Sequence, residues 1–257
     1  MNHEKVALVF GGARGIGAAI AARLAREGYR VAITWVSRPD RAQALVSTIE
    51  QQGGQAIAIE ADSADAAAIQ AAVDTTLRHY GRLDVAVVNA GVLRLGTIEE
   101  YSLADLDTTL AVNVRGVFLA IQAAVKPMAE GGRIITIGSN TAVRTGHAGS
   151  SVYAMSKAAV ASMVQNLALD LAPRRITINN IQPGPIATDM TAGMAEQIVG
   201  SIPLQRMGEP DEIASLAAWL AGTSSGYMTG ASRPLTADLF FSHSGQGCPQ
   251  HGAMPDP

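Results

Sequence analysis

The feature that most constrains the fold is a regular alternation of short apolar runs with longer, alanine-rich stretches of helical period. The short runs have the length of strands: Val6–Phe10, Val31–Trp35, Ala56–Ile59, Val85–Val88, Ile134–Ile137 and Ile176–Ile181. The longer stretches lie between them: Gly15–Glu27, Arg41–Gln52, Ala64–Tyr80, Leu103–Met128 and Val152–Ala172. Alternating strands and helices form βαβ units around a parallel sheet. We therefore predict an α/β protein with a single-domain Rossmann fold, a doubly wound parallel sheet of about seven strands with helices on both faces.

The bulk properties agree with one ordered domain. The 257 residues are 48% hydrophobic and only 16% charged, which suits a sheet that is covered on both faces. No shift in composition marks a linker before about residue 230. We predict one domain over residues 1–241, with a loop over 189–205 near the ligand, and a disordered tail over 242–257, which is polar and rich in Gly, Pro and His.

The same properties argue against several classes of protein. A net charge of −3 offers no attraction to nucleic acid or to an anionic membrane. The single cysteine, Cys248, cannot form an internal disulfide and suits a reducing compartment. We find neither a signal peptide nor an apolar stretch near the roughly 20 residues of a membrane helix, so we predict a cytoplasmic protein. His243, Cys248 and His251 lack zinc-type spacing, and no metal is expected.

A glycine-rich turn follows the first predicted strand and leads directly into a helix. It reads Gly11-Gly12-Ala13-Arg14-Gly15-Ile16-Gly17. Glycines at this spacing allow a tight turn, a close approach of backbone to phosphate, and tight packing of the helix on the strand. The free N–H groups at the helix N-terminus then bind the pyrophosphate. We predict a dinucleotide site that includes Gly11, Ala13, Arg14, Gly15, Ile16 and Gly17.

The end of the second strand predicts which dinucleotide binds. An NAD site is expected to have an acidic residue here for the ribose 2′-hydroxyl, but the sequence reads Val36-Ser37-Arg38. Arg38 and Arg14 could together bind a 2′-phosphate, since a guanidinium matches phosphate geometry. The alternative is that both arginines are solvated charges on the surface. We predict NADP(H), with Ser37 and Arg38 at the phosphate and with Asp62 and Ser63, after the third strand, beside the adenine; Asp62 is also a candidate helix N-cap.

Tyr153 and Lys157 place a phenol and an ammonium four residues apart, on one face of a predicted helix. A tyrosine with its usual pKa of about 10 is a poor proton relay at neutral pH. An adjacent ammonium favours the phenolate, and lowering the pKa to about 7 requires about 4 kcal/mol. Such a pair alone is usually helix surface, so its meaning depends on the residues around it.

Several other polar or small residues occur where an open α/β sheet binds its ligands. Ser139 follows the fifth strand, and Asn113 lies inside a helical segment, where an amide is a poor helix former. Asn89-Ala90-Gly91 closes the fourth strand with small residues, and Pro183-Gly184-Pro185 interrupts the chain after the sixth. Together with Tyr153 and Lys157, these residues predict a catalytic site beside the dinucleotide.

The ordered set of motifs resembles the short-chain dehydrogenase/reductase family over about residues 5–232. The motifs are GGARGIG, VNAG, NVRG, IGS, YAMSK and QPGPIATDM. The resemblance implies that Tyr153 is the general acid/base, that Lys157 lowers its pKa and holds the nicotinamide ribose, that Ser139 binds the substrate oxygen, and that Asn113 anchors a water. It implies further cofactor contacts from Asn89, Ala90, Gly91, Pro183, Gly184, Ile186 and Thr188. It also implies an NADP(H)-dependent carbonyl reductase or alcohol dehydrogenase that forms a homotetramer, or a dimer if the C-terminus prevents larger assembly.

The sequence departs from the family pattern at two places. Phe10 and Val88 replace the usual Thr and Asn at neighbouring strand ends, and we expect the two apolar side chains to pack together. Residues 233–238 replace the usual last strand, and Pro234 predicts that this strand is short or lies at an edge. Residues 234–238 read Pro-Leu-Thr-Ala-Asp. A DNA sequence that encodes the usual Thr-Ile-Asp-Gly-Gly can encode these five residues when its codons are read one base later. We hypothesise a reading-frame shift, which a gene lacking that frame would exclude.

The sequence leaves the substrate open. We predict a pocket bounded by Asn140, Arg144, His147, Ser150 and the segment 189–205, which includes Met190 and Met194. The apolar character of this segment favours an apolar carbonyl compound, although methionines at such spacing are more often helix packing. A second hypothesis is a regulatory protein on the same fold with weak turnover, because some phrases of the sequence also resemble a subgroup associated with biofilm dispersal and cyclic-dinucleotide binding. The complete Asn113, Ser139, Tyr153 and Lys157 set favours the enzyme.

Overall fold

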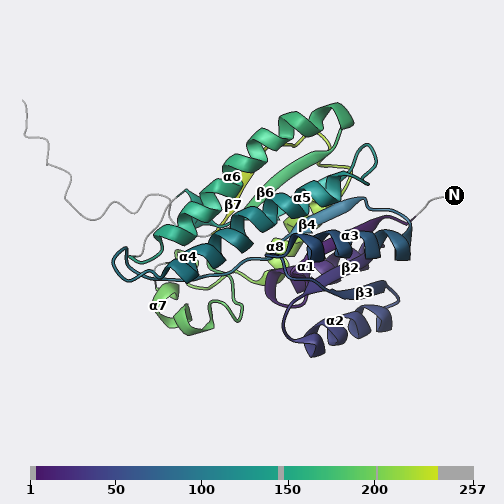
Figure 1. Ribbon diagram of the computed structural model, residues 1–257. Helices are drawn as coiled ribbons and strands as arrows, with labels where there is room; N and C mark the ends of the chain where they lie inside the picture. The colour runs from purple at the N-terminus through teal and green to yellow at the C-terminus, as the bar shows by residue number, and fades with distance from the viewer. Residues whose placement is uncertain (1–3, 144–147, 201, 237–257) are drawn as a thin grey trace, which may run out of the picture.

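The computed structural model describes residues 4–143, 148–200 and 202–236, and it contains a seven-stranded sheet (Figure 1). The strand order is β3-β2-β1-β4-β5-β6-β7, and every neighbouring pair is parallel. The strands are β1 (Val6–Phe10), β2 (Arg30–Trp35), β3 (Gln55–Glu60), β4 (Val85–Val88), β5 (Arg133–Ile137), β6 (Thr177–Pro183) and β7 (Ser232–Leu235). The order reverses between β1 and β4, which is where ligands bind in doubly wound sheets. The predicted Rossmann architecture is confirmed.

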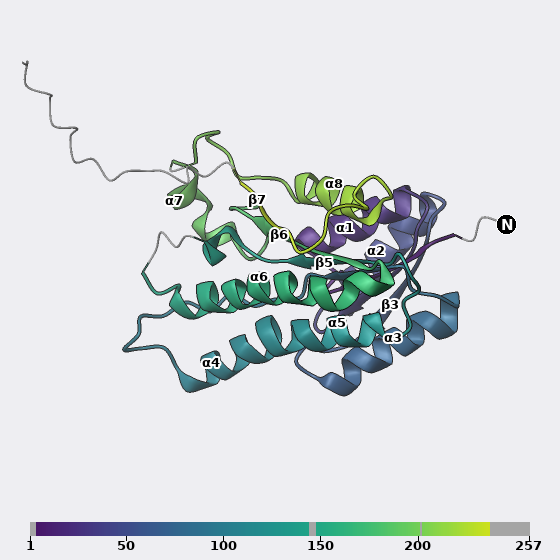
Figure 2. The same cartoon turned by 90° about the horizontal axis from the view of Figure 1, so that it is seen from above.

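Helices cover both faces of the sheet, as Figure 2 shows from above. The helices are α1 (Gly15–Arg26), α2 (Pro39–Gln51), α3 (Ala66–Tyr80), α4 (Leu103–Leu110), α5 (Val117–Val125), α6 (Ser151–Leu171), α7 (Ala195–Val199) and α8 (Pro210–Ala221). One apolar cluster joins the sheet to α1, α2 and α8, and a second joins its other face to α3, α5 and α6. Burial on both sides explains why the strand sequences are continuous apolar runs.

Helix α3 begins later than the sequence predicts. Its N-cap is Asp65, whose side chain accepts a hydrogen bond from Ala67 N at 2.8 Å. Asp62 accepts from Ala64 N, also at 2.8 Å, and so shapes the turn before the helix rather than capping it. The N-cap role predicted as an alternative for Asp62 is therefore wrong, and its carboxylate remains at the edge of the sheet.

Helices α4 and α5 form one continuous stretch through a π-helical segment, Ala111–Gly116. This stretch, Leu103–Val125, has the length and hydropathy of a membrane span, which contradicts the expectation from sequence that no such stretch exists. A core helix of a globular domain passes the same test, and 44% of the most apolar window is buried inside the fold. Val117, Ala120 and Ile121 pack in the cluster beside α3. The stretch is therefore a core element.

The two apolar departures from the family pattern lie side by side. Phe10 of β1 and Val88 of β4 are register partners in the sheet, and both belong to the same buried cluster. Each side chain is almost completely inaccessible to solvent. The predicted packing of one against the other is confirmed.

Strand β7 has four residues and lies at the edge of the sheet, as Pro234 predicts. It pairs with β6, and Pro234 stands opposite Gln182. The last residues of the predicted domain, 237–241, and the predicted tail, 242–257, lie outside the described residues.

Candidate functional site

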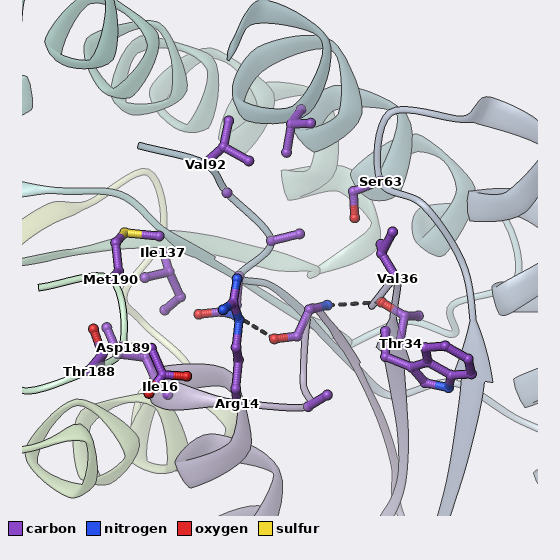
Figure 3. Close-up of a pocket in the computed structure, with 18 of the residues that line it drawn as sticks. Arg14, Ile16, Thr34, Val36, Ser63, Val92, Ile137, Thr188, Asp189 and Met190 are labelled. Carbon is purple, nitrogen blue, oxygen red and sulfur yellow. Dashed lines mark hydrogen bonds between the residues drawn. The ribbon is translucent and has the colours of Figure 1, made fainter. Parts of the chain in front are cut away.

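A cavity of about 480 Å³ opens at the carboxyl edge of the sheet, around the point where the strand order reverses. Most of the predicted cofactor and catalytic residues line it: Gly11, Ala13, Arg14, Gly15, Ile16, Ser37, Arg38, Asp62, Ser63, Asn89, Ala90, Gly91, Ser139, Tyr153, Lys157, Pro183, Gly184, Ile186 and Thr188. Figure 3 shows part of this lining, with Arg14 between the end of β2 and the loop that carries Thr188, Asp189 and Met190. Residues from six strand ends thus meet in one pocket.

The glycine turn is shaped by close backbone contacts. Gly11 has a φ of +72°, and a Cβ there would lie 2.8 Å from the Cα of Ala90. A Cβ at Gly17 would collide with the carbonyl oxygen of Gly11 and with the amide of Asn89. Asn89 Nδ2 donates to that same carbonyl at 2.7 Å. Gly17 therefore lets α1 pack on the turn, and Gly11 brings the turn against the end of β4.

The start of α1 is suited to an anion. Arg14 at its N-cap is extended and makes no side-chain cap, and the first turn of the helix contains no acidic residue. The N–H groups of this turn therefore face the pocket without a carboxylate of the helix to bind them. Together with the glycine contacts, this arrangement fits the pyrophosphate of a dinucleotide.

The rim beside β2 is rich in arginine. Arg38 has a left-handed backbone, with a φ of +73°, and forms an ion pair with Asp40 at 2.7 Å. Arg41, which the sequence analysis missed, also lines the pocket and forms an ion pair with Asp189. Its position in the first turn of α2, three residues after Arg38, was the available signal. Arg14, Arg38 and Arg41 together fit the additional phosphate of NADP(H).

The deepest part of the pocket holds the predicted catalytic residues. Ser139 follows β5, while Tyr153 and Lys157 lie on the first two turns of α6. Tyr153 is hydrogen-bonded to Ser139. Lys157 Nζ donates to the carbonyl oxygen of Ile137 at 3.0 Å and lies 5.7 Å from the centre of the Tyr153 ring. The helical spacing predicted from sequence thus directs both side chains toward the end of β5.

The pKa values in this part of the pocket differ from the sequence-based argument. Burial raises the pKa of Tyr153, and the hydrogen bond from Ser139 lowers it by a smaller amount. Burial also lowers the pKa of Lys157 to about 8. In the protein by itself the pKa of Tyr153 therefore lies above its usual value, because burial outweighs the hydrogen bond with Ser139. Tyr153 is therefore held as a neutral phenol, which is a proton donor.

Two threonines that the sequence analysis missed organise this region. Thr141 donates from its backbone N, at 3.2 Å, and from its hydroxyl, at 2.9 Å, to Ser139 Oγ. Thr191 donates to the carbonyl oxygen of Ile186, and its hydroxyl accepts from Thr188 N at 3.1 Å. Neither lies in a recognisable motif position, so only the folded loops identify them.

Asn113 lies in the π-helical segment, completely buried, behind the pocket wall. Its Oδ1 accepts from Val92 N at 2.8 Å, and its Nδ2 donates to Val92 O at 2.9 Å and to Ser156 Oγ at 3.1 Å. Single π turns inside α-helices are frequent at functional sites. Here the amide fixes the segment that follows Gly91 to helix α6, one turn from Tyr153.

The predicted substrate residues are only partly placed. Met190 lines the pocket and is half exposed, and Asn140 begins a 3₁₀ turn, Asn140–Ala142, directly after Ser139. Met194 closes a second short turn, Ala192–Met194. Arg144 and His147 lie outside the described residues. Val92 and Ile137 supply further apolar lining that the sequence analysis did not identify.

Comparison with known proteins places these features in context. The family described as enoyl-(acyl carrier protein) reductase matches the chain over residues 11–235. A solved short-chain dehydrogenase/reductase from Serratia marcescens is 50% identical, covers 93% of this chain and 99% of its own, and superimposes with a TM-score of 0.89. A short-chain dehydrogenase from Burkholderia cenocepacia, solved in complex with NADP, is 45% identical with the same coverage of both chains and a TM-score of 0.89.

A curated relative carries a regulatory name. The cyclic-di-GMP-binding biofilm dispersal mediator protein of Escherichia coli is 40% identical over 230 residues, which cover 88% of this chain and 93% of the relative. Both kinds of relative therefore span nearly the whole described fold.

Proposed function

Because this chain belongs to the short-chain dehydrogenase/reductase family and is an NADP(H)-dependent oxidoreductase, we propose that Tyr153, Ser139, Lys157 and Asn113 carry the reaction. The reaction is the transfer of a hydride between NADP(H) and a carbonyl or secondary alcohol. The observation that carries the proposal is the buried Tyr153–Ser139 hydrogen bond in the pocket that also contains the glycine turn. A proton donor and a hydrogen-bond donor thus meet where a carbonyl oxygen can bind.

In this proposal the protein handles the proton and the oxygen. Bound NADPH supplies the hydride. Tyr153 holds a proton at Oη, because burial raises its pKa, and it gives that proton to the substrate oxygen. Ser139 donates a hydrogen bond to the same oxygen and stabilises the charge that develops there. Lys157 binds the cofactor ribose from its position on the Ile137 carbonyl, and Asn113 holds α6 in register with the end of β4.

The proposed cofactor site includes the lining residues of the glycine turn and the arginine rim, and Gly17 acts by packing. Asp62 and Ser63 lie beside the adenine in this proposal, while Pro183, Gly184, Ile186 and Thr188 contact the nicotinamide end. The last two are held in place by Thr191.

The proposed substrate is an apolar ketone, aldehyde or 3-oxoacyl compound. Val92, Ile137 and Met190 give apolar walls to the pocket that also holds the Tyr153–Ser139 pair. A site with few polar groups selects substrates by shape and apolar contact.

We further propose a cytoplasmic homotetramer, with a dimer as the smaller possible assembly. Phe118 of α5 and Met155 and Leu169 of α6 are large apolar side chains that stay exposed on the single chain. Large apolar side chains left exposed on the helices of a single chain are typical of a subunit interface.

The experiment is NADPH oxidation, followed by absorbance, against a panel of ketones, aldehydes and acetoacetyl thioesters, with NADH in parallel. We expect turnover with NADPH, much less with NADH, and none with Tyr153→Phe. Cofactor binding is measured separately for both proteins. Binding of NADPH without turnover of any panel member would contradict the proposal.

The regulatory hypothesis is tested in the same preparation. Its support is the name of the Escherichia coli relative and the sequence phrases shared with that subgroup. A cyclic dinucleotide that binds tightly, together with absent turnover, would favour it over the reductase. The buried Tyr153–Ser139 pair has no function in a protein that only binds, so we favour the enzyme.

A further inference from the structure

Two carboxylates pair with the arginines at the rim of the pocket: Asp40, next to Arg38 in the chain, and Asp189, from a distant loop. Asp189 forms an ion pair with Arg41, and Arg14, Arg38 and Arg41 all line the same rim. Their guanidinium groups hold the pKa of Asp189 below its usual range, Arg41 most strongly and then Arg14 and Arg38. Figure 3 shows Asp189 next to Arg14, on the loop that continues to Met190. The space between these three guanidinium groups suits a negatively charged oxygen group.

The cofactor brings an oxyanion of its own to these cations. NADP differs from NAD by a 2′-phosphate, and a guanidinium binds carboxylate and phosphate with the same forked geometry. Arg41 and Asp189 are 38% and 54% exposed, so their ion pair is solvated and exchanges at low cost. A phosphate with about two negative charges therefore competes well for Arg41.

We propose that Asp189 is an internal competitor for the 2′-phosphate, and that the phosphate takes Arg41 from Asp189 and releases the Asp189 side chain. The adenosine end of the cofactor site is thereby coupled to the segment that carries Met190. The proposal concerns binding of the phosphorylated cofactor, and it holds whichever carbonyl compound is reduced.

The turn from Thr188 to Thr191, which contains Asp189 and Met190, is held independently of Arg41. Thr191 bonds to the carbonyl oxygen of Ile186 and to the backbone N of Thr188, and its hydroxyl also contacts the carbonyl oxygen of Thr188 at 3.1 Å. These bonds do not involve the Asp189 side chain. Loss of the ion pair therefore frees the Asp189 side chain and changes the charge beside Met190, while the backbone of the Thr188–Thr191 turn keeps its shape.

The binding test compares two ligands that differ only in the 2′-phosphate. Adenosine 2′,5′-bisphosphate and 5′-AMP are titrated by calorimetry into the protein and into Asp189→Asn, which keeps the shape and removes the charge. We expect the variant to bind the bisphosphate about fivefold more tightly and 5′-AMP with unchanged affinity. Glu27→Gln is the matched control, because it removes an exposed carboxylate that pairs with Arg23 outside the pocket. Unchanged or equally weakened binding of both ligands would overturn the proposal.

A double-mutant cycle assigns the effect to Arg41. Arg41→Gln alone should weaken the bisphosphate about tenfold, and Asp189→Asn should have no further effect in that background. If Asp189→Asn still tightens binding without Arg41, the carboxylate acts as a general repulsive charge and the competition model is wrong.

The loop is followed by NMR of methyl-labelled methionine, with the Met190 signal assigned through Met190→Leu. The bisphosphate should shift this signal in the unmodified protein, and 5′-AMP should not. The free Asp189→Asn protein should already show a signal near the shifted position, while the signal of buried Met128 stays fixed as an internal control. A Met190 signal that responds equally to both ligands would show that the 2′-phosphate does not release Asp189 from Arg41.

Discussion

Lys157 and Arg41 are both cations of the same pocket, yet the fold holds them in opposite ways. Lys157 is buried and bonded to a backbone carbonyl, and burial lowers its pKa to about 8. Arg41 is exposed and paired with a carboxylate 148 residues away in the chain. Electrostatic interactions are strong where water is excluded and weak where water and salt screen them. The end that holds Lys157 is therefore fixed before any ligand arrives, while the end that holds Arg41 has an exposed ion pair that we propose exchanges partners.

The largest expected effect is that of Tyr153→Phe, which should act on turnover and leave cofactor binding nearly unchanged. Tyr153→Phe removes the proton donor and should reduce turnover about 10³-fold, the usual scale of general acid catalysis, while the NADPH dissociation constant changes less than about threefold. Steady-state kinetics and calorimetry measure the two quantities. Tyr227→Phe is the matched control, since the side chain of Tyr227 is fully exposed. Equal loss of binding and turnover would show that Tyr153 shapes the cofactor site instead.

Burial of Lys157 should also be visible in stability. Its folded pKa of about 8 is below its usual value, so between about pH 8 and pH 10.5 the unfolded chain binds more protons than the folded one. Stability due to this group therefore rises with pH across that window, and below pH 8 the full cost of about 3 kcal/mol is present. Urea unfolding at pH 7 and pH 10 should show this dependence, and Lys157→Met should remove it.

Lys126→Met is the control for that experiment, because Lys126 is exposed. The comparison of each variant with the unmodified protein at the same pH cancels the titration of the tyrosines. A pH dependence that survives in Lys157→Met would assign it to another buried group.

At the exposed end the expected effects are smaller. Arg38→Gln should weaken NADPH binding about five- to tenfold and leave NADH binding unchanged, because only the 2′-phosphate needs this guanidinium. Arg175→Gln is the control, since Arg175 is exposed and pairs with Glu130 away from the pocket. Similar losses for both cofactors would show that Arg38 supports the pocket through its unusual backbone.

The smallest effect is that of salt. Between about 50 and 300 mM salt, NADPH affinity should fall severalfold more than NADH affinity, because the exposed arginine contacts are screened. Turnover at saturating cofactor should change little over the same range, because the buried end is not screened. If salt lowers NADPH affinity and NADH affinity equally, the contrast between the exposed arginines and the buried Lys157 is wrong.

Much of the site was predictable because its signals are local. The glycine turn, the Tyr153–Lys157 spacing and the Asn89-Ala90-Gly91 strand end each occupy a few consecutive residues, and a parallel sheet brings all strand ends to one edge. The packing of Phe10 against Val88 was also predictable, because each residue stands at the end of a strand and the two strands are neighbours in the parallel sheet.

The features that escaped prediction depend on contacts between distant segments. Arg41 meets Asp189 only because α2 and the loop after β6 meet at the rim, and Thr191 is recognised only by its bonds to Ile186 and Thr188. The sign of the pKa change at Tyr153 also required the fold, because burial outweighs the hydrogen bond with Ser139. By itself the sequence determined the architecture, the family and the cofactor, since these are encoded in periodicity and short motifs. The tertiary structure alone decided which charges are desolvated and which exchange, because solvation depends on the packing of segments far apart in the chain.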